Sequence, residues 1–265
     1  MLELRHVTKT FAKGTVNEHT ALRDVSLTLQ DDDFITILGS NGAGKSTLFG
    51  AIAGTFYVDE GEIILDGKHL ESLPEHKRAR AVGTLFQDPM KGTAPDLTIE
   101  ENLSLACNQT RRFPLAMAVQ KKDLQFYREQ LSAFQMGLED RMKMKVGLLS
   151  GGQRQALTLL MATIAHPKLL LLDEHTAALD PATAEKVMAI TVQIVREQKI
   201  PTMMITHNMG QALTTGNRTI MMDAGQIILD IAGDERKEMT VPKLMTLYSG
   251  ARGKELDNDR MLLSQ

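Results

Sequence analysis

Residues 34–47 (FITILGSNGAGKST) constrain the fold of this chain more than any other stretch. They begin with a short, almost wholly apolar run, Phe34–Leu38, which is typical of a buried strand. The run continues into a loop that contains Gly39, Gly42 and Gly44. Glycine permits backbone conformations and close approaches that bulkier residues block, so the N–H groups of such a loop can surround a polyphosphate. The sequence therefore predicts a phosphate-binding loop.

The spacing Gly39-x-x-x-x-Gly44-Lys45-Ser46 indicates what the loop binds. Lys45 would reach the β and γ oxygens of a nucleotide, and the Ser46 hydroxyl would ligate Mg²⁺. The following residues, 48–53, predict a helix whose positive N-terminal end faces the phosphates. A plain glycine turn before a helix is the alternative, but the complete motif after a strand favours a nucleotide site. The predicted contacts are Gly39, Ser40, Asn41, Gly42, Ala43, Gly44, Lys45, Ser46 and Thr47.

Composition limits the class of protein. The chain has 265 residues, 43% of them hydrophobic and 24% charged, which suits one soluble globular domain with subdomains. Its net charge of -3 provides no general field for holding nucleic acid, so the basic clusters 76–80 and 111–112 are interpreted as solvated surface. No signal peptide or membrane-spanning run is evident, and the single cysteine, Cys107, excludes an intrachain disulfide. These features predict a cytoplasmic protein.

Other segments divide into strands and helices. Residues 2–7, 25–29 and 62–65 predict a small antiparallel sheet, and residues 81–86 predict a strand that runs into Gln87. Helical patterns begin at Thr98, so we interpret residues 88–165 as a mainly helical subdomain. Residues 219–222 and 226–229 predict a hairpin. The chain is charged from Asp234, and disorder is predicted from Ala251.

The stretch Ser150-Gly151-Gly152-Gln153 opens the last helix of the helical region. Ser150 and Gln153 have the spacing of a capping box. Capping alone does not require two successive glycines, which weaken a first turn but leave its N–H groups open to an anion. We therefore interpret this stretch as a second phosphate-binding surface.

Polar residues follow two further predicted strands. The apolar run 168–172 ends in Asp173 and Glu174, and side chains at the carboxyl edge of an α/β sheet point into the ligand crevice. There Asp173 could hold Mg²⁺, and Glu174 could deprotonate an attacking water. The strand 201–206 is followed by His207, which we place beside the γ-phosphate, although a single histidine is more often structural. Asp180 and Pro181 predict the start of a helix that runs to about Gln198.

These segments together resemble the ATP-binding subunit of an ABC transporter. The resemblance covers residues 2–230. GSNGAGKST resembles the Walker A motif, LLLLDE the Walker B motif, and Leu149–Gln153 the signature sequence. Gln87 matches the Q-loop, residues 178–180 the D-loop, and His207 the switch histidine. Phe11 stands where the family places an aromatic residue that stacks on adenine.

The resemblance implies an α/β P-loop NTPase fold with a RecA-like core, an antiparallel β subdomain and an inserted helical subdomain. Residues 1–233 would form the nucleotide-binding domain and residues 234–265 a charged tail. It also implies a head-to-tail dimer with a second copy, in which Ser150, Gly151, Gly152, Gln153 and Asp180 act across the interface on the partner's ATP. Lys45, Gln87, Glu174 and His207 would be catalytic, and Ser46, Gln87 and Asp173 would bind Mg²⁺.

The resemblance further implies a peripheral protein at the cytoplasmic face of the membrane, with a permease as direct partner and a solute-binding protein as indirect partner. Segments 11–18, 87–95 and 171–180 are similar to an importer subfamily that serves amino acids and sugars, some members being assigned to tryptophan or tyrosine. One departure is His175, which stands where the family commonly has proline.

Three alternatives remain at this stage. An exporter ATPase would carry the same motifs. The second alternative is a soluble ABC ATPase acting on DNA, ribosomes or iron–sulfur assembly. Ribosome-type members usually carry two sets of motifs and DNA-repair members a long coiled coil, whereas this chain has a single set and residues 87–150 lack sustained heptads. A P-loop kinase would not need residues 150–153.

Overall fold

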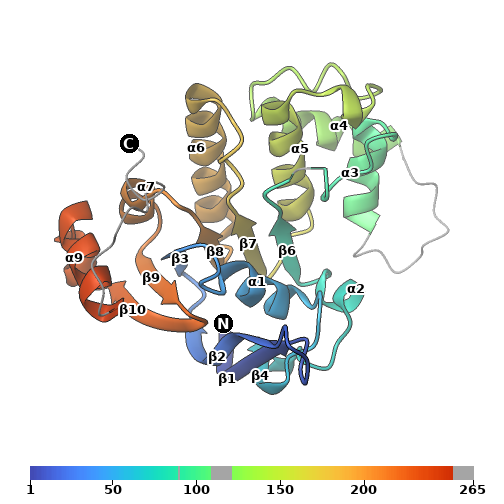
Figure 1. The fold of residues 1–265 in the computed structure, drawn as a ribbon. Helices are drawn as coiled ribbons and strands as arrows, with labels where there is room; N and C mark the ends of the chain where they lie inside the picture. Colours follow the sequence, from blue (N-terminus) through green and yellow to red (C-terminus); the bar gives the residue numbers. More distant parts are fainter. Residues whose placement is uncertain (89, 109–120, 253–265) are drawn as a thin grey trace. The chain divides into compact units, whose positions relative to one another are not determined.

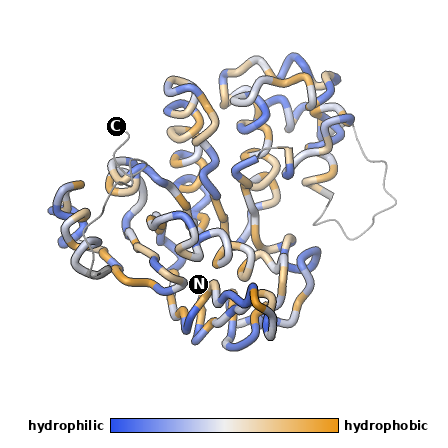
Figure 2. Tube along the Cα trace, in the orientation of Figure 1, coloured by the Kyte–Doolittle hydropathy of each residue, from blue (hydrophilic) through white to orange (hydrophobic). Residues whose placement is uncertain are grey.

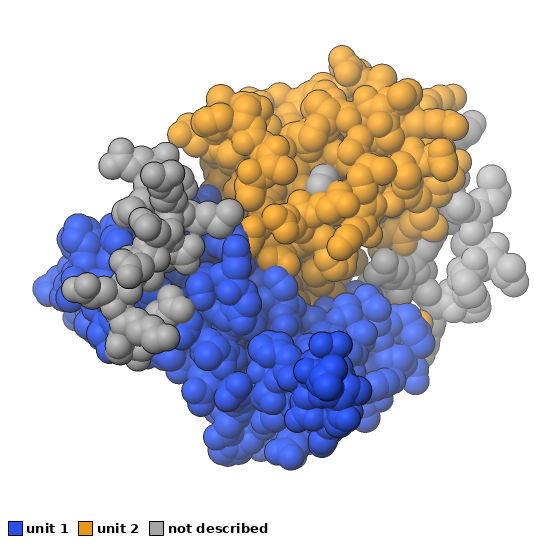
Figure 3. All heavy atoms as spheres, viewed as in Figure 1, with its two compact units in different colours: residues 1–79, 201–265 blue, residues 80–200 orange. Residues whose placement is uncertain are grey.

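The computed structural model describes residues 1–88, 90–108 and 121–252. The chain divides into two compact units, which are described separately below. Unit 1 combines residues 1–79 with residues 201–265, and unit 2 consists of residues 80–200 (Figure 3). The nucleotide motifs predicted from the sequence are therefore distributed over both units.

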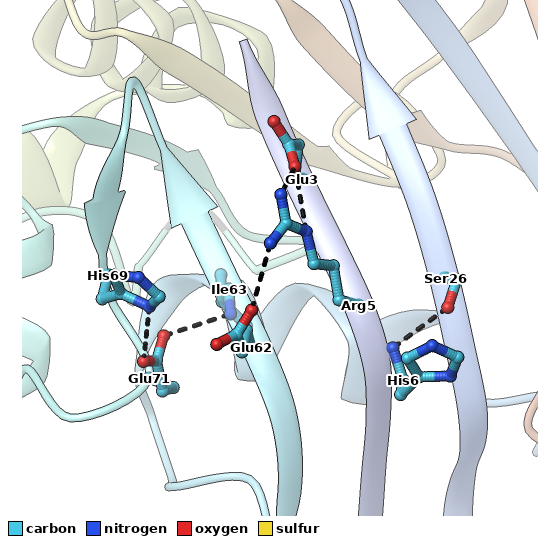
Figure 4. Close-up of polar contacts among 8 residues, drawn as sticks. All are labelled: Glu3, Arg5, His6, Ser26, Glu62, Ile63, His69 and Glu71. Atoms are coloured by element: carbon cyan, nitrogen blue, oxygen red, sulfur yellow. Dashed lines mark hydrogen bonds and ion pairs between the residues drawn. The ribbon is translucent and has the colours of Figure 1, made fainter.

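Unit 1 contains the predicted antiparallel sheet. Its strand order is β2-β1-β4-β5, formed by β1 (Leu2–Phe11), β2 (His19–Leu29), β4 (Glu60–Leu65) and β5 (Lys68–His69). Apolar residues pair on the buried face, for example Leu4 with Leu27 and with Ile63. On the polar face, Arg5 donates to Glu3 on its own strand and to Glu62 on the neighbouring strand β4 (Figure 4). The alternation of buried apolar and exposed polar side chains explains why the three predicted segments form one sheet.

The remaining strands of unit 1 have the order β10-β9-β3-β8. They are β3 (Phe34–Gly39), β8 (Thr202–Ile205), β9 (Arg218–Asp223) and β10 (Gln226–Ala232). Every residue of β3 is buried, and β3 pairs in parallel with β8 on one side and β9 on the other. This explains its continuous apolar sequence. The predicted hairpin is confirmed by β9 and β10, and the short helix α7 (Met209–Thr214) connects β8 to β9.

Helix α1 (Lys45–Ala53) follows the phosphate-binding loop, and the carbonyl groups of its last turn bind the side chain of Arg78. Arg78, in α2 (Glu75–Arg78), is only 1% exposed and donates to the carbonyl oxygens of Ala51 at 2.6 Å and Ile52 at 3.2 Å. The interpretation of residues 76–80 as solvated surface is therefore wrong for Arg78. Carbonyls of the last turn have no partner within their own helix, and the guanidinium group supplies one. Burial lowers the pKa of Arg78.

Residues beyond 232 do not simply extend as a charged tail. They form α8 (Gly233–Lys237) and α9 (Val241–Arg252), of which α9 is labelled in Figure 1. Ala251, where disorder was predicted to begin, lies within α9. Met239, Leu244 and Tyr248 are buried in an apolar cluster with residues of β3 and β9. Leu244 and Tyr248 lie four residues apart, on one face of α9, and the charge of the C-terminal segment as a whole did not indicate this buried face. The disorder predicted for the C-terminus falls mainly on residues 253–265, outside the described residues.

Unit 2 contains one parallel strand pair and most of the long helices. β6 (Val82–Leu85) pairs with β7 (Leu169–Asp173), and the helices are α3 (Ile99–Asn108), α4 (Lys121–Ser132), α5 (Gly151–Thr163) and α6 (Pro181–Gln198), with the short η1 (Val146–Leu148). Helix α5 packs against both α3 and α6 (Figure 1). Polar and apolar residues alternate along α6 (Figure 2), and Val187, Thr191 and Val195 form its buried face. In the described part of the chain, no helix is long and apolar enough to cross a bilayer.

Candidate functional site

The phosphate-binding loop of unit 1 has the glycine-dependent backbone that the sequence predicts. Gly39, Gly42 and Gly44 have φ angles of 151°, 80° and 99°. A Cβ atom on Gly39 would lie 2.3 Å from the Met222 carbonyl oxygen, and one on Gly44 would lie 2.6 Å from that of Ala21. A Cβ on Gly42 would meet nothing within 4 Å. Gly42 is therefore required by its backbone conformation, and the other two also by close packing.

Lys45 is held inside this loop. It is the first residue of α1 and is only 6% exposed. Its Nζ donates to the carbonyl oxygens of Gly39 at 2.7 Å and Ser40 at 3.0 Å. The N-cap residue, Gly44, has no side chain to bond the first amides of α1, and the first turn holds no acidic residue. An ammonium group and an open helix N-terminus thus lie together, which is the arrangement that binds phosphate.

His207 lies at the same edge of the strands as the phosphate-binding loop. The parallel pair β3 and β8 aligns Ile37 with Ile205, so Gly39 and His207 follow at equivalent positions. The turn that carries His207 is fixed by its neighbours, because the side chain of Asn208 caps α7 through a 2.8 Å bond from the Gln211 amide. The predicted placement of His207 at a strand end beside the loop is thus present within unit 1.

Phe11, at the end of β1, is 38% exposed. Its ring meets the ring of Phe56 edge to face, with centroids 5.1 Å apart, and Lys9 Nζ lies 5.4 Å from the Phe11 centroid. Asp59 accepts hydrogen bonds from the Thr10 amide and from Lys9. These two interactions, the amide's first, lower the pKa of the Asp59 carboxyl group. Sequence reasoning missed Phe56, since no periodic pattern links it to Phe11.

Unit 2 places the predicted acidic residues near Gln87. The parallel pair β6 and β7 aligns Leu85 with Leu172, so Gln87 follows β6 at the edge where β7 ends in Asp173 and continues into Glu174. Gln87 is exposed, and the two acids are half-buried. The backbone of Glu174 has a φ angle of 46°, a conformation that residues other than glycine seldom adopt.

His175, the residue after these acids, is buried, with 3% exposure. Its Nε2 lies 3.2 Å from the Thr191 hydroxyl oxygen in α6. Burial lowers the pKa of the imidazole to about 4, because a charged ring would lose its hydration there. The ring is therefore neutral near pH 7.

The capping box predicted at residues 150–153 is confirmed. Ser150 Oγ accepts from the Gln153 amide, and Gln153 Oε1 accepts from the Ser150 amide. The two glycines between them differ. A Cβ on buried Gly152 would lie 2.3 Å from Thr183 Cγ2 in α6, whereas a Cβ on exposed Gly151 would make only ordinary contact with Leu179, at 3.6 Å. Packing of α5 against α6 thus requires glycine at position 152, whereas neither capping nor packing requires it at position 151.

Asp180 caps α6, as its sequence predicts. Its side chain accepts from the Thr183 amide at 3.1 Å, and Pro181 occupies the first turn. The hydrogen bonds from Thr183 lower the pKa of the Asp180 carboxyl group. The carboxylate is therefore already engaged within its own chain.

The predicted site residues are divided between the units. Unit 1 holds Phe11, residues 39–47 and His207, and unit 2 holds Gln87, residues 150–153, Asp173, Glu174 and Asp180. The donors predicted for Mg²⁺, from Ser46, Gln87 and Asp173, are all oxygens, the ligand type that this ion prefers. Within the described residues, no group of three or more His, Cys, Asp or Glu side chains could hold a metal ion by itself.

Comparison with known proteins identifies relatives along nearly the whole chain. A family model described as ABC transporter matches residues 22–177. The tyrosine transport ATP-binding protein of Clostridioides difficile (strain R20291) is 41% identical over 253 residues, which cover 95% of this chain and 100% of that protein. The xylose/arabinose import ATP-binding protein XylG of Sulfolobus acidocaldarius is 33% identical, over 94% of this chain and 95% of that protein. The spermidine/putrescine import ATP-binding protein PotA of Haemophilus ducreyi is 35% identical, over 92% of this chain but only 60% of its own length.

Solved structures give the same result. A dimeric ATP-binding cassette in a post-hydrolysis state, bound to ADP and phosphate, matches with a TM-score of 0.76 and 28% identity, over 88% of this chain and 98% of that one. A second cassette, in its ADP conformation, matches with a TM-score of 0.76 and 25% identity, over 94% of this chain and 98% of that one. The α/β P-loop NTPase fold predicted from the sequence is confirmed by these likenesses.

Proposed function

The chain belongs to the ABC transporter family and is an ATPase, and on this basis we propose that it drives an importer. It would couple ATP-dependent closure of a dimer to solute uptake through a separate permease. Support comes from the relatives named above, which are ATP-binding proteins of transport or import systems. The full-length likeness to a tyrosine transport protein favours an aromatic amino acid as the solute.

The geometry of the phosphate-binding loop carries the catalytic part of the proposal. Lys45, buried against the loop carbonyls, would move its ammonium onto the β and γ oxygens of ATP and stabilise the charge that develops there. Ser46, Gln87 and Asp173 would hold Mg²⁺, which when bound neutralises further phosphate charge. Glu174 would accept a proton from the attacking water, and His207 would contact the γ-phosphate.

The exposed end of α5 supports a role for a second copy of the chain. Gly151 is open to solvent at the N-terminus of a 13-residue helix, and packing does not explain its lack of a side chain. We assign Ser150, Gly151, Gly152, Gln153 and Asp180 to contacts with ATP bound by a head-to-tail partner. Phe11, already braced by Phe56, would stack on the adenine. Permease binding would bring the protein to the cytoplasmic face of the membrane.

The first test is purification of the tagged protein from its native membranes, with partners identified by mass spectrometry. An importer predicts a permease together with a solute-binding protein. Recovery of an efflux permease alone would make the protein an exporter ATPase. Partners from the ribosome or DNA repair, without a permease, would contradict the transport assignment. Uptake of labelled tyrosine, with and without an excess of other amino acids, then tests the solute.

The second test addresses the chemistry. Glu174→Gln should bind ATP as the wild type does and lose turnover by a factor of about 10² to 10⁴, the usual contribution of a general base. Lys45→Ala is the matched control, because it should lose ATP binding as well. Retained hydrolysis in Glu174→Gln would remove Glu174 as the base.

A further inference from the structure

The backbone at Glu174 is in an unusual conformation that some neighbouring group must maintain. Its φ angle of 46° is sparsely populated by residues with a side chain, and such conformations persist only where the surrounding structure holds them. The Glu174 carbonyl oxygen accepts a hydrogen bond from the Ala177 amide at 3.0 Å, so the chain turns sharply after β7. The turn ends where Asp180 caps α6.

A buried hydrogen-bonded chain joins this turn to the middle of α6. The Thr191 hydroxyl group donates to the Val187 carbonyl oxygen at 2.8 Å. Its only proton is thus used, and the Thr191 oxygen must accept from Nε2–H of His175, 3.2 Å away. Thr191 is 0% exposed and His175 is 3% exposed, so water does not compete for either group. The tautomer of the neutral imidazole is thereby assigned, with its proton on Nε2.

We propose that His175 is a positioning residue for hydrolysis. Its hydrogen bond to Thr191 fastens the turn after β7 to α6, and so holds the Glu174 carboxylate where it can accept the proton of the attacking water. The inference rests on the proposed function, in which Glu174 is the general base.

Three variants separate positioning from simple core filling. His175→Leu keeps a comparable apolar volume but cannot donate. His175→Gln retains an amide Nε2–H that can reach Thr191, and Thr191→Val removes the acceptor while keeping the β-branched shape. For the full-length protein, kcat and KM for ATP are measured together with the thermal unfolding temperature.

We expect His175→Leu and Thr191→Val each to lower kcat by about tenfold to a hundredfold, the range caused by small misplacements of catalytic groups, with KM for ATP within about twofold of wild type. His175→Gln should recover most of kcat. The double variant His175→Leu with Thr191→Val should be no slower than the slower single variant, because both remove the same hydrogen bond.

The Glu174→Gln variant, measured beside His175→Leu, distinguishes failure of this inference from failure of the proposed function. If Glu174→Gln alone retains turnover, the general-base assignment fails and the inference fails with it. If Glu174→Gln abolishes turnover while His175→Leu keeps the wild-type kcat, only the inference is overturned. Equal losses in His175→Leu and His175→Gln, in proportion to lost stability, would also overturn it. Should neither His175 variant fold, Thr191→Val decides: a wild-type kcat refutes the proposal, and a reduced kcat with unchanged KM supports it.

Discussion

At the scale of single residues, two adjacent glycines have different physical reasons. Gly152 is buried where a Cβ would lie 2.3 Å from Thr183, a stiff β-branched side chain, whereas Gly151 is exposed and uncrowded. From the sequence alone, Gly151 and Gly152 could not be distinguished. The structure shows that only Gly151 is free of a packing constraint, so any functional demand for glycine falls mainly on that position.

Substitution by alanine should separate these reasons. Gly152→Ala should lower the free energy of unfolding by about 1–3 kcal/mol, the usual cost of overpacking a tight contact. Gly151→Ala should leave stability nearly unchanged and lower ATPase activity, because the methyl group would cover open N–H groups. Chemical denaturation and steady-state hydrolysis of both purified variants measure the difference. Equal destabilisation would contradict the assignment.

The carboxyl group of Asp59 should make stability depend on acid. Its pKa is lowered in the folded protein by the Thr10 amide and by Lys9. A depressed pKa contributes stability above the unfolded value near 3.8, and this contribution is lost as the pH falls through the lower folded value. Asp59→Asn should therefore be less stable than wild type near neutral pH, and the difference should shrink as the pH falls below about 4. Urea unfolding between pH 7 and pH 3 tests this, and a constant difference would be contrary to it.

At the scale of elements, the C-terminal end of α1 is completed by a residue distant in sequence. The C-terminal carbonyls of α1 accept hydrogen bonds from Arg78, and the same guanidinium group also donates to Leu73 and Glu71 carbonyls. Gly54 leaves room for it, since a Cβ there would lie 2.6 Å from Arg78 Nε. The helix that follows the phosphate-binding loop is thus held at its far end by a buried cation.

Replacement of Arg78 tests this role. Arg78→Met keeps much of the side-chain volume but leaves several buried carbonyls unpaired, which should cost about 2–4 kcal/mol in the free energy of unfolding. The neighbouring exposed cation in Lys77→Met is a matched control and should change stability by less than about 0.5 kcal/mol. Thermal or urea unfolding gives both values. If both substitutions changed the free energy of unfolding by similarly small amounts, the proposed role of Arg78 at the end of α1 would be wrong.

At the scale of the whole molecule, the distribution of motifs makes a quantitative prediction for two copies. Lys45→Ala and Gly151→Asp should each abolish hydrolysis alone, since both sites of a head-to-tail dimer would be damaged. In a mixed dimer both changes fall in the same site, and the other site is intact. An equimolar mixture should recover about a quarter of the wild-type activity, from half of the dimers with one working site each. No recovery in dimers shown to have exchanged would exclude sites shared between copies.

Local patterns predicted much of the fold and of the candidate site. The caps at Ser150 and Asp180 and the hairpin of β9 and β10 depend on contacts within a few residues. The partners of β3 are distant in sequence, but its continuous apolar run was sufficient to predict a buried strand. Helix α9 and the preceding Met239 were not predicted, because their apolar residues can be recognised as core only where they pack on β3 and β9. The charge composition of residues 234–265 therefore did not predict that part of this segment packs against the core.

The sequence by itself determined the phosphate-binding loop, the acidic and histidine positions that follow strands, and the helix starts. Each of these rests on residue types at short, regular spacings, which set backbone conformation and hydrogen bonding locally. Only the tertiary structure decided that Arg78 is buried, that Phe56 braces Phe11, that Gly152 fits against α6, and that His175 bonds to Thr191. Burial and partnership of a side chain depend on which distant segment packs against it, and spacing along the chain does not contain that information.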